Sequence, residues 1–133
     1  PVLLRLKSDL VSHCMAALNN SLNREKVEWE TRKSLGVVMA SGGYPGNYSN
    51  NHPILGLEDI SSKYGHKVFH GGTKFADNRL VTNGGRVLCV TALGNSLEDA
   101  KTSAYELVSK ISWENVQYRT DIGWRAIEKN RKN

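Results

Sequence analysis

Residues 83–93 read Asn83-Gly84-Gly85-Arg86-Val87-Leu88-Cys89-Val90-Thr91-Ala92-Leu93, a glycine turn followed directly by an apolar run of strand length. A second stretch has the opposite order, because the apolar run 35–40 leads into the turn Ser41-Gly42-Gly43-Tyr44-Pro45-Gly46. Short apolar runs bounded by turn residues predict strands. Asn-Gly tolerates positive φ, so the turn 83–85 predicts a hairpin that joins strands 79–82 and 86–93.

The remaining elements complete a small mixed domain. Residues 67–70 and 116–119 predict two more strands, and the segment 47–65, rich in Asn, Ser, Gly and Pro, predicts a long loop with an extended piece at 54–55. Ser96, followed by Glu98 and Asp99, predicts the start of a helix over 97–110, and 121–127 predicts a turn that leads into a short terminal helix. The expected fold is α+β: a small antiparallel sheet of four to five strands with one packed helix.

The N-terminal quarter of the chain differs in pattern from the rest. Apolar residues recur every three or four positions from Val2 to about Leu22, which predicts one amphipathic helix, and the charged segment 24–33 predicts a linker or an edge strand at Val27 and Trp29. The composition changes at Ser34, so we divide the chain into 1–33 and 34–133. The apolar face of the helix is expected to dock on the sheet or on a second chain, which makes self-association possible.

Composition sets limits on the class of protein. The 133 residues are 39% hydrophobic and 23% charged, which is typical of one folded domain. No apolar run approaches the length of a membrane span, the first residues do not resemble a secretory signal, and a cytoplasmic protein is expected. The net charge of +5 suits an anionic ligand or nucleic acid, although several positive charges gather in the tail 125–132. Cys14 and Cys89 have no partners at metal-ligand spacing, so buried free thiols are expected.

The two glycine turns are the first candidate site. Glycines allow backbone N–H groups to converge on an anion, and Arg86 adds a planar charged group at the edge of a strand. A tight turn in a small sheet is the alternative explanation of each Gly-Gly pair. His70, at a strand end before two glycines, could point into a cleft, but the sequence shows no orienting partner for a general base. The candidate substrate-binding residues are Arg86, Gly84, Gly85, Gly42, Gly43, Tyr44, Pro45, His70 and Thr73.

Nothing in the sequence supplies the rest of a phosphoryl-transfer site. A Walker A loop and a dinucleotide fingerprint are both absent, and no paired carboxylates are placed to hold magnesium. The histidines have no metal-ligand spacing. We therefore expect no metal site and no catalytic residue in this chain, only part of an active site whose remainder lies elsewhere.

Four stretches together resemble the C-terminal region of the glycinamide ribonucleotide synthetases, the phosphoribosylamine–glycine ligase family of the ATP-grasp ligases. They are residues 35–46, 67–73, 81–94 and 121–126, and their order and spacing match over nearly the whole chain. The opening residues 1–10 resemble the helix that follows the metal-binding strand of the family's ATP-grasp domain. Gly71 stands where the family usually has alanine.

The resemblance implies an enzyme of purine biosynthesis that joins glycine to 5-phosphoribosylamine and converts ATP to ADP and phosphate, with magnesium. The family's nucleotide-binding and magnesium-binding residues precede the position of Pro1. The chain alone is therefore expected to be inactive and to bind neither ATP nor Mg²⁺, with the remainder of the ligase as its partner.

The resemblance also implies roles on the substrate side. A basic residue at the start of the corresponding strand holds the substrate phosphate in related ligases, which matches Arg86. Residues 42–45 would shape the cleft wall, and His70 and Thr73 would add hydrogen bonds. The alternative function is a free-standing basic module that binds nucleic acid, with an affinity that falls steeply as salt rises.

Overall fold

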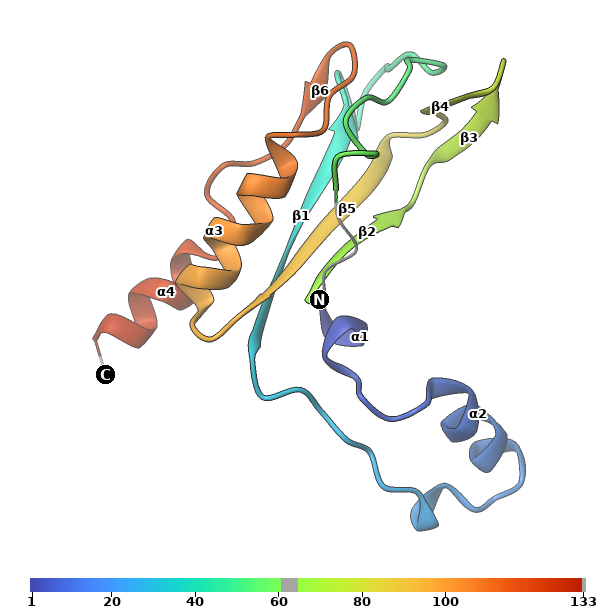
Figure 1. Cartoon of the computed structure of the whole chain (residues 1–133), viewed down its shortest axis with the longest axis vertical. Coiled ribbons are helices and arrows are strands. Elements are labelled where there is room, and N and C mark those ends of the chain that lie inside the picture. The colour runs from blue at the N-terminus through green and yellow to red at the C-terminus, as the bar shows by residue number, and fades with distance from the viewer. Residues whose placement is uncertain (61–64, 133) are drawn as a thin grey trace.

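The computed structural model describes residues 1–60 and 65–132. Within those residues the strands form a four-stranded antiparallel sheet in the order β2-β5-β1-β6 and a separate two-stranded sheet of β3 and β4 (Figure 1). The strands are β1 (Lys33–Ser41), β2 (His66–His70), β3 (Thr73–Ala76), β4 (Arg79–Thr82), β5 (Arg86–Gly94) and β6 (Val116–Gln117). The helices are α1 (Val2–Arg5), α2 (Leu10–Leu18), α3 (Leu97–Val108) and α4 (Trp124–Arg131), with a short 3₁₀ turn at Leu22–Arg24. The α+β class is confirmed.

The long strands β1 and β5 form the centre of the sheet. They pair antiparallel from Lys33↔Gly94 to Ala40↔Arg86, with an irregularity between Met39 and Ala40. Side chains alternate between the two faces of a strand, so Val37 and Met39 share one face and Val38 points to the other. Val37 and Met39 are completely buried, whereas Val38 is 43% exposed.

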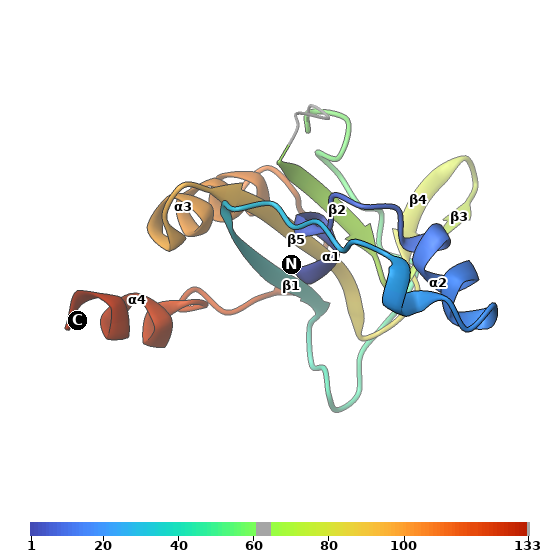
Figure 2. The same ribbon diagram turned by 90° about the horizontal axis from the view of Figure 1, so that it is seen from below.

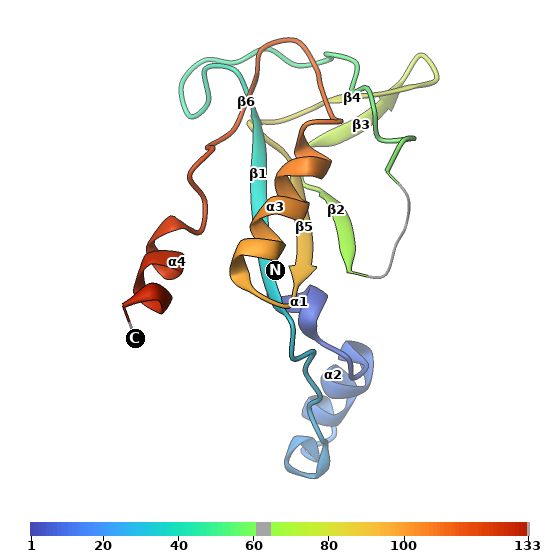
Figure 3. The ribbon, with the colours of Figure 1, turned by 60° about the vertical axis from the view of Figure 1, so that its left-hand side comes forward.

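Helix α3 covers the buried face of this sheet (Figures 2 and 3). Ala100, Ala104, Leu107 and Val108 are its buried residues, and small alanines allow the helix to approach the strands closely. The predicted helix start is confirmed, because Ser96 Oγ accepts from the Asp99 N–H and Asp99 accepts from the Ser96 N–H in a capping box. Helix α4 stands apart from the sheet and is held by Ile127, which is 8% exposed.

The predicted hairpin between strands 79–82 and 86–93 is wrong. Strand β4 pairs with β3, and β5 pairs with β1 and β2. Strand β3 was missed by the sequence analysis, and the turn of the real hairpin is Asp77-Asn78, where both residues have positive φ of 48° and 59°. Such values suit a type I′ turn, so Asp-Asn provides here the turn that we assigned to Asn-Gly.

The single helix predicted over 2–22 is also wrong. Leu6 is extended, and the chain restarts at Asp9, whose side chain caps α2 by accepting from the Val11 N–H. The predicted edge strand at Val27 and Trp29 is reduced to one isolated bridge, Leu6↔Trp29. The N-terminal residues thus form an out-and-back arm (Figure 1), closed by bonds such as Glu30 N–H to Arg5 O at 2.6 Å.

Within the described residues the arm contacts the sheet through Pro1 and α1. Pro1 lies against Gly36, and its carbonyl accepts from Ser34 Oγ at 3.1 Å. In α2 four apolar side chains remain exposed: Leu10, Val11, Met15 and Leu18. Docking of the whole predicted helix on the sheet is therefore not seen within one chain, and self-association stays a prediction.

Three smaller expectations are partly met. The last strand ends at Gln117 rather than at residue 119. The extended piece at Ile54-Leu55 is present as the bridge Leu55↔Ser112, and residues 61–64 of the predicted loop lie outside the described residues. Both cysteines are free, but Cys14 is exposed rather than buried.

Candidate functional site

The fold brings the two glycine turns of the sequence together at one end of the sheet. The Ser41 N–H donates to Gly85 O and Ser41 Oγ donates to Gly84 O, both at 2.8 Å. Ser41 is 2% exposed, so these bonds are shielded from water. The end of β1 and the start of β5 are therefore fixed to each other just before Arg86.

A third glycine pair joins the cluster. Gly71 and Gly72, after β2, both donate their N–H groups to Val87 O at 2.9 and 3.0 Å, and Gly72 O accepts from the Asn83 N–H. A Cβ on Gly72 would lie 2.8 Å from Arg86 O and 3.2 Å from Gly84 Cα. Close backbone packing explains this glycine, and its N–H group is already used within the fold.

The Tyr44 ring packs against the glycine turns. It lies so close to Gly85 that a Cβ there would overlap the ring, at 2.0 Å from Cδ2. The Tyr44 carbonyl accepts from Gln117 Nε2 at 2.8 Å, and the ring meets Tyr48 edge-on at 6.0 Å. The 41–46 turn is thus tied to the residues just before β5 and to β6.

Arg86 and His70 line the same cavity. It has a volume of about 190 Å³, and its other lining residues are Val38, Phe69, Gly71, Leu88 and Cys89. His70 Nδ1 lies 3.1 Å from Thr73 Oγ1, so Thr73 orients the imidazole. Among the described residues no carboxylate lies within ion-pair distance of Arg86, which is exposed. The Arg86 guanidinium is therefore not neutralised by an acidic side chain of the described residues.

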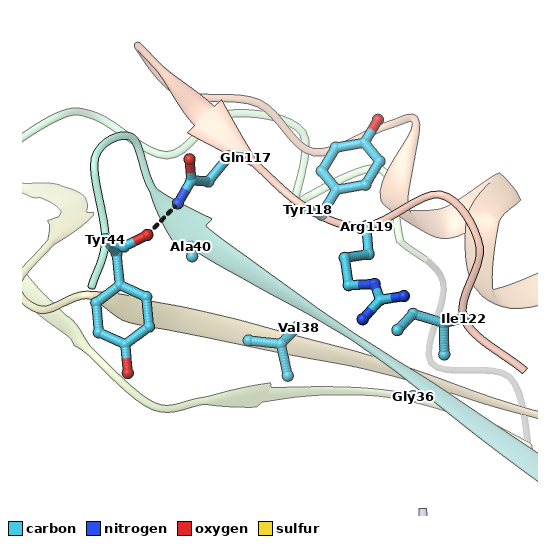
Figure 4. A pocket seen from close by; sticks show the side chains of 8 residues that line it. All are labelled: Gly36, Val38, Ala40, Tyr44, Gln117, Tyr118, Arg119 and Ile122. Atoms are coloured by element: carbon cyan, nitrogen blue, oxygen red, sulfur yellow. Dashed lines mark hydrogen bonds between the residues drawn. The ribbon is translucent and has the colours of Figure 1, made fainter. Parts of the chain in front are cut away.

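A larger cavity of about 470 Å³ lies beside this one on the same face of the sheet (Figure 4). It is lined by Gly36, Val38, Ala40, Tyr44, Gln117, Tyr118, Arg119 and Ile122. Val38 lines both cavities. Tyr44 is the predicted site residue here, whereas Gly42, Gly43 and Pro45 line neither cavity.

The sequence analysis missed the contribution of residues 117–122 to this surface. Arg119 forms a two-bond ion pair with Asp121, with N–O distances of 2.8 and 2.6 Å. The bonds from Arg119 lower the pKa of Asp121 and those from Asp121 raise the pKa of Arg119. Asp121 neutralises this arginine, and Arg125 lies over the Trp124 ring at 5.4 Å. The sequence analysis had singled out the neighbouring stretch 121–126, as part of the family resemblance. Its position beside β1 becomes visible only in the fold.

A hydrogen-bonded chain holds the loop that follows the Tyr44 turn. Ser49 Oγ lies 2.6 Å from His52 Nε2, and His52 Nδ1 lies 3.1 Å from Glu114 Oε2. The backbone of His52 is also bonded to Thr82, through both its N–H and its carbonyl. These contacts fasten the loop to β4 and to the segment before β6.

Comparisons with known proteins show the family of this chain. Residues 34–125 match the family model "Phosphoribosylglycinamide synthetase, C domain". The chain belongs to this family. Phosphoribosylamine–glycine ligase of Escherichia coli K12 is 54% identical over 130 residues, which are 97% of this chain and 30% of that protein. The enzyme of the same name from Vibrio parahaemolyticus is 47% identical over 132 residues, 99% of this chain and 30% of the relative.

A solved structure extends the likeness to the fold. The crystal structure of phosphoribosylamine–glycine ligase from Thermotoga maritima superposes with a TM-score of 0.65 and 32% identity, over 81% of this chain and 27% of that chain. This chain thus spans about 30% of the length of the curated relatives that it matches, as their C-terminal region.

Two absences hold for the described part of the chain. No helix in residues 1–60 and 65–132 is long and apolar enough to cross a membrane. Over the same residues no group of three His, Cys, Asp or Glu side chains is placed to hold a metal ion.

Proposed function

We propose that this chain forms the C-terminal, substrate-side part of a ligase that joins glycine to 5-phosphoribosylamine with conversion of ATP to ADP and phosphate. The observation that carries the proposal is the glycine cluster, which fixes Arg86 beside a small cavity with no carboxylate of the described residues to neutralise it. The relatives' names supply the substrates, and the match over the glycine turns supports transfer of that function.

In this proposal Arg86 binds the phosphate of the ribose substrate. Its guanidinium offers paired donors that suit two phosphate oxygens, and Ser41 holds the preceding glycines in place. His70, oriented by Thr73, donates a hydrogen bond within the same cavity. Tyr44 walls the neighbouring cavity, while Gly42, Gly43, Gly84, Gly85 and Pro45 shape the turns that carry these side chains.

The residues of this chain bind and orient substrate in this proposal, and ATP and Mg²⁺ belong to the part of the ligase that precedes it. The chain alone is expected to be inactive, and the complete enzyme is expected in the cytoplasm. The domain division at 33/34 is part of the proposal. It is supported by the start of the family match at residue 34 and by the out-and-back arm before it.

The test is Arg86→Ala in the complete ligase. Loss of a charge-assisted pair is worth about 1.5–3 kcal/mol, so the KM for phosphoribosylamine should rise roughly 10- to 150-fold, while the KM for ATP stays within about two-fold. The matched control is Arg79→Ala, on the β3–β4 hairpin and outside the Arg86 cavity. An unchanged KM for phosphoribosylamine in Arg86→Ala would remove the phosphate role.

The nucleic-acid alternative has its own measurement. A basic module would bind duplex DNA with a log–log salt slope of about −0.9 for each phosphate contacted. The ligase proposal expects no such binding by the complete protein. Tight, steeply salt-dependent DNA binding together with no ligation would favour the alternative.

A further inference from the structure

The outer face of the sheet, opposite α3, has an apolar surface that the described chain leaves partly open. Val38 on β1 is 43% exposed and Phe69 on β2 is 36% exposed, and Cys89 lies between them in the register of the sheet. The two cavities adjoin along this face and share Val38. We call the face formed by Gly36, Val38, Ala40, Phe69 and Cys89 the outer face.

The charges around the larger cavity suit a protein segment better than a polyanion, whereas the exposed Arg86 lines only the smaller one. Arg119, at the larger cavity, is neutralised by Asp121 in a two-bond pair. The floor of that cavity is glycine, valine and alanine, and Tyr44 and Tyr118 are its aromatic residues. Tyrosine is typical of the buried core of protein interfaces, where charge is depleted.

The first residue of the chain is seated on this same face. A Cβ on Gly36 would lie 3.0 Å from Pro1 Cγ, 3.2 Å from Pro1 Cδ and 3.3 Å from Cys89 Sγ. Pro1 Cδ is bonded to the Pro1 nitrogen, and in a longer chain the preceding carbonyl carbon is bonded to that same nitrogen. The preceding residue therefore begins about 2.5 Å from a Cδ that lies near Gly36, and Gly36 is one of the residues that line the larger cavity.

The distances along the strand set the size of the occupant. From Gly36 to Ala40 there are four residue-to-residue steps along β1, which is about 13 Å at the usual rise of a strand. An extended segment of roughly four to six residues is enough to cover that length. The relatives are about three times longer than this chain, and the matched region is their C-terminal part, so such a segment is present in them.

We propose that the outer face is the docking surface for the part of the ligase directly N-terminal to Pro1, and that apolar side chains of that segment enter the 470 Å³ cavity over Val38. The inference rests on the proposed place of this chain at the end of a longer ligase. It assigns Val38, Ala40 and Tyr118 to contacts within the enzyme rather than to substrate.

The test compares two cysteine variants of the full-length ligase, Val38→Cys and Phe75→Cys, with all other cysteines replaced by serine. Val38 and Phe75 are 43% and 79% exposed, so exposure in the described structure alone predicts reaction rates within a factor of about two. Docking predicts that N-ethylmaleimide reacts with the Val38→Cys thiol at least about ten-fold more slowly than with the Phe75→Cys thiol, without any substrate. Rates within two-fold of each other overturn the proposal.

A second measurement distinguishes a docked protein segment from an open ligand-binding cleft. Protection of the Val38→Cys thiol that requires phosphoribosylamine, glycine or ATP would assign the face to ligand and overturn the proposal. Val38→Asp should lower the Tm of the full-length ligase more than Phe75→Asp does, and an equal Tm would contradict docking. Ligase activity is measured separately, on the Phe75→Cys variant. If that variant is inactive while the Val38→Cys thiol is protected, the proposed function is rejected but the proposed docking stands.

Discussion

The two faces of the β1–β5 sheet differ in how far the rest of the chain covers them. On the inner face Val37, Met39 and Val90 are fully buried beneath α3, which the same chain supplies. On the outer face Val38 and Phe69 stay accessible, and the nearest covering groups are the glycine turns and Pro1. The inner face is therefore completed by the chain itself, whereas in our proposals the outer face is where substrate and the rest of the ligase contact the domain.

The largest difference between the faces should appear when one side chain is shortened on each. Met39→Ala empties a fully buried site under α3 and should lower the free energy of unfolding by about 2–5 kcal/mol. Val38→Ala, one residue away on the open face, should change it by less than about 0.5 kcal/mol in the 133-residue chain. Urea denaturation of both variants measures this, and equal costs would show that the outer face is packed too.

The glycine cluster offers a finer comparison between adjacent positions. Gly85→Ala places a methyl group inside the Tyr44 ring, at 2.0 Å from Cδ2, and should cost about 1–3 kcal/mol as the ring is displaced. Gly84→Ala is the matched control, because its Cβ would lie 3.4 Å from Gly72 Cα, an ordinary contact. Denaturation curves give the two costs, and near-ultraviolet circular dichroism follows the displaced tyrosine. If Gly84→Ala is the more damaging change, Tyr44 does not pack as described.

The inner face was largely predictable from sequence, for local reasons. Its strands are apolar runs bounded by turns, and Ser96 caps α3 as expected, in a capping box with Asp99 that was not predicted. The pairing was less predictable, because Asn83-Gly84 has the pattern of a hairpin turn. In the fold these residues lie between two sheets, where Asn83 N–H donates to Gly72 O. The conformation of such a turn depends on tertiary contacts with distant residues, and these cannot be read from a short stretch of sequence.

The candidate site was predictable only in part, for the same reason. Arg86 and His70 were singled out because each stands next to glycines at a strand end, and the fold places both on one cavity. Tyr118 and Arg119 carried no local signal, since they reach β1 only through the short pairing of β6 with Ala40 and Ser41. Contacts between segments some 70 residues apart, such as Gln117 to Tyr44, depend on topology.

A smaller effect is expected where α3 begins, since α3 is the cover of the inner face. Ser96→Ala removes the side chain that accepts from the Asp99 N–H and should cost about 1 kcal/mol. Ser109→Ala, at the other end of the same helix, should stay within about 0.5 kcal/mol. Thermal denaturation of the pair tests the assignment. Equal losses at both ends would mean that the cap does not limit the stability of this face.

The smallest effect concerns the charge of the same cap. The backbone N–H of Ser96, followed by its hydroxyl, holds the pKa of Asp99 below its ordinary value of 3.8. Because the folded state has the lower pKa, the stabilisation is fully present above 3.8 and is lost as the pH falls through the pKa of the folded protein. The decrease in Tm between about pH 6 and pH 3 should therefore be smaller for Asp99→Asn than for the wild type. An Asp99→Asn profile that matches the wild-type profile would show that this carboxylate adds nothing to the stability of α3.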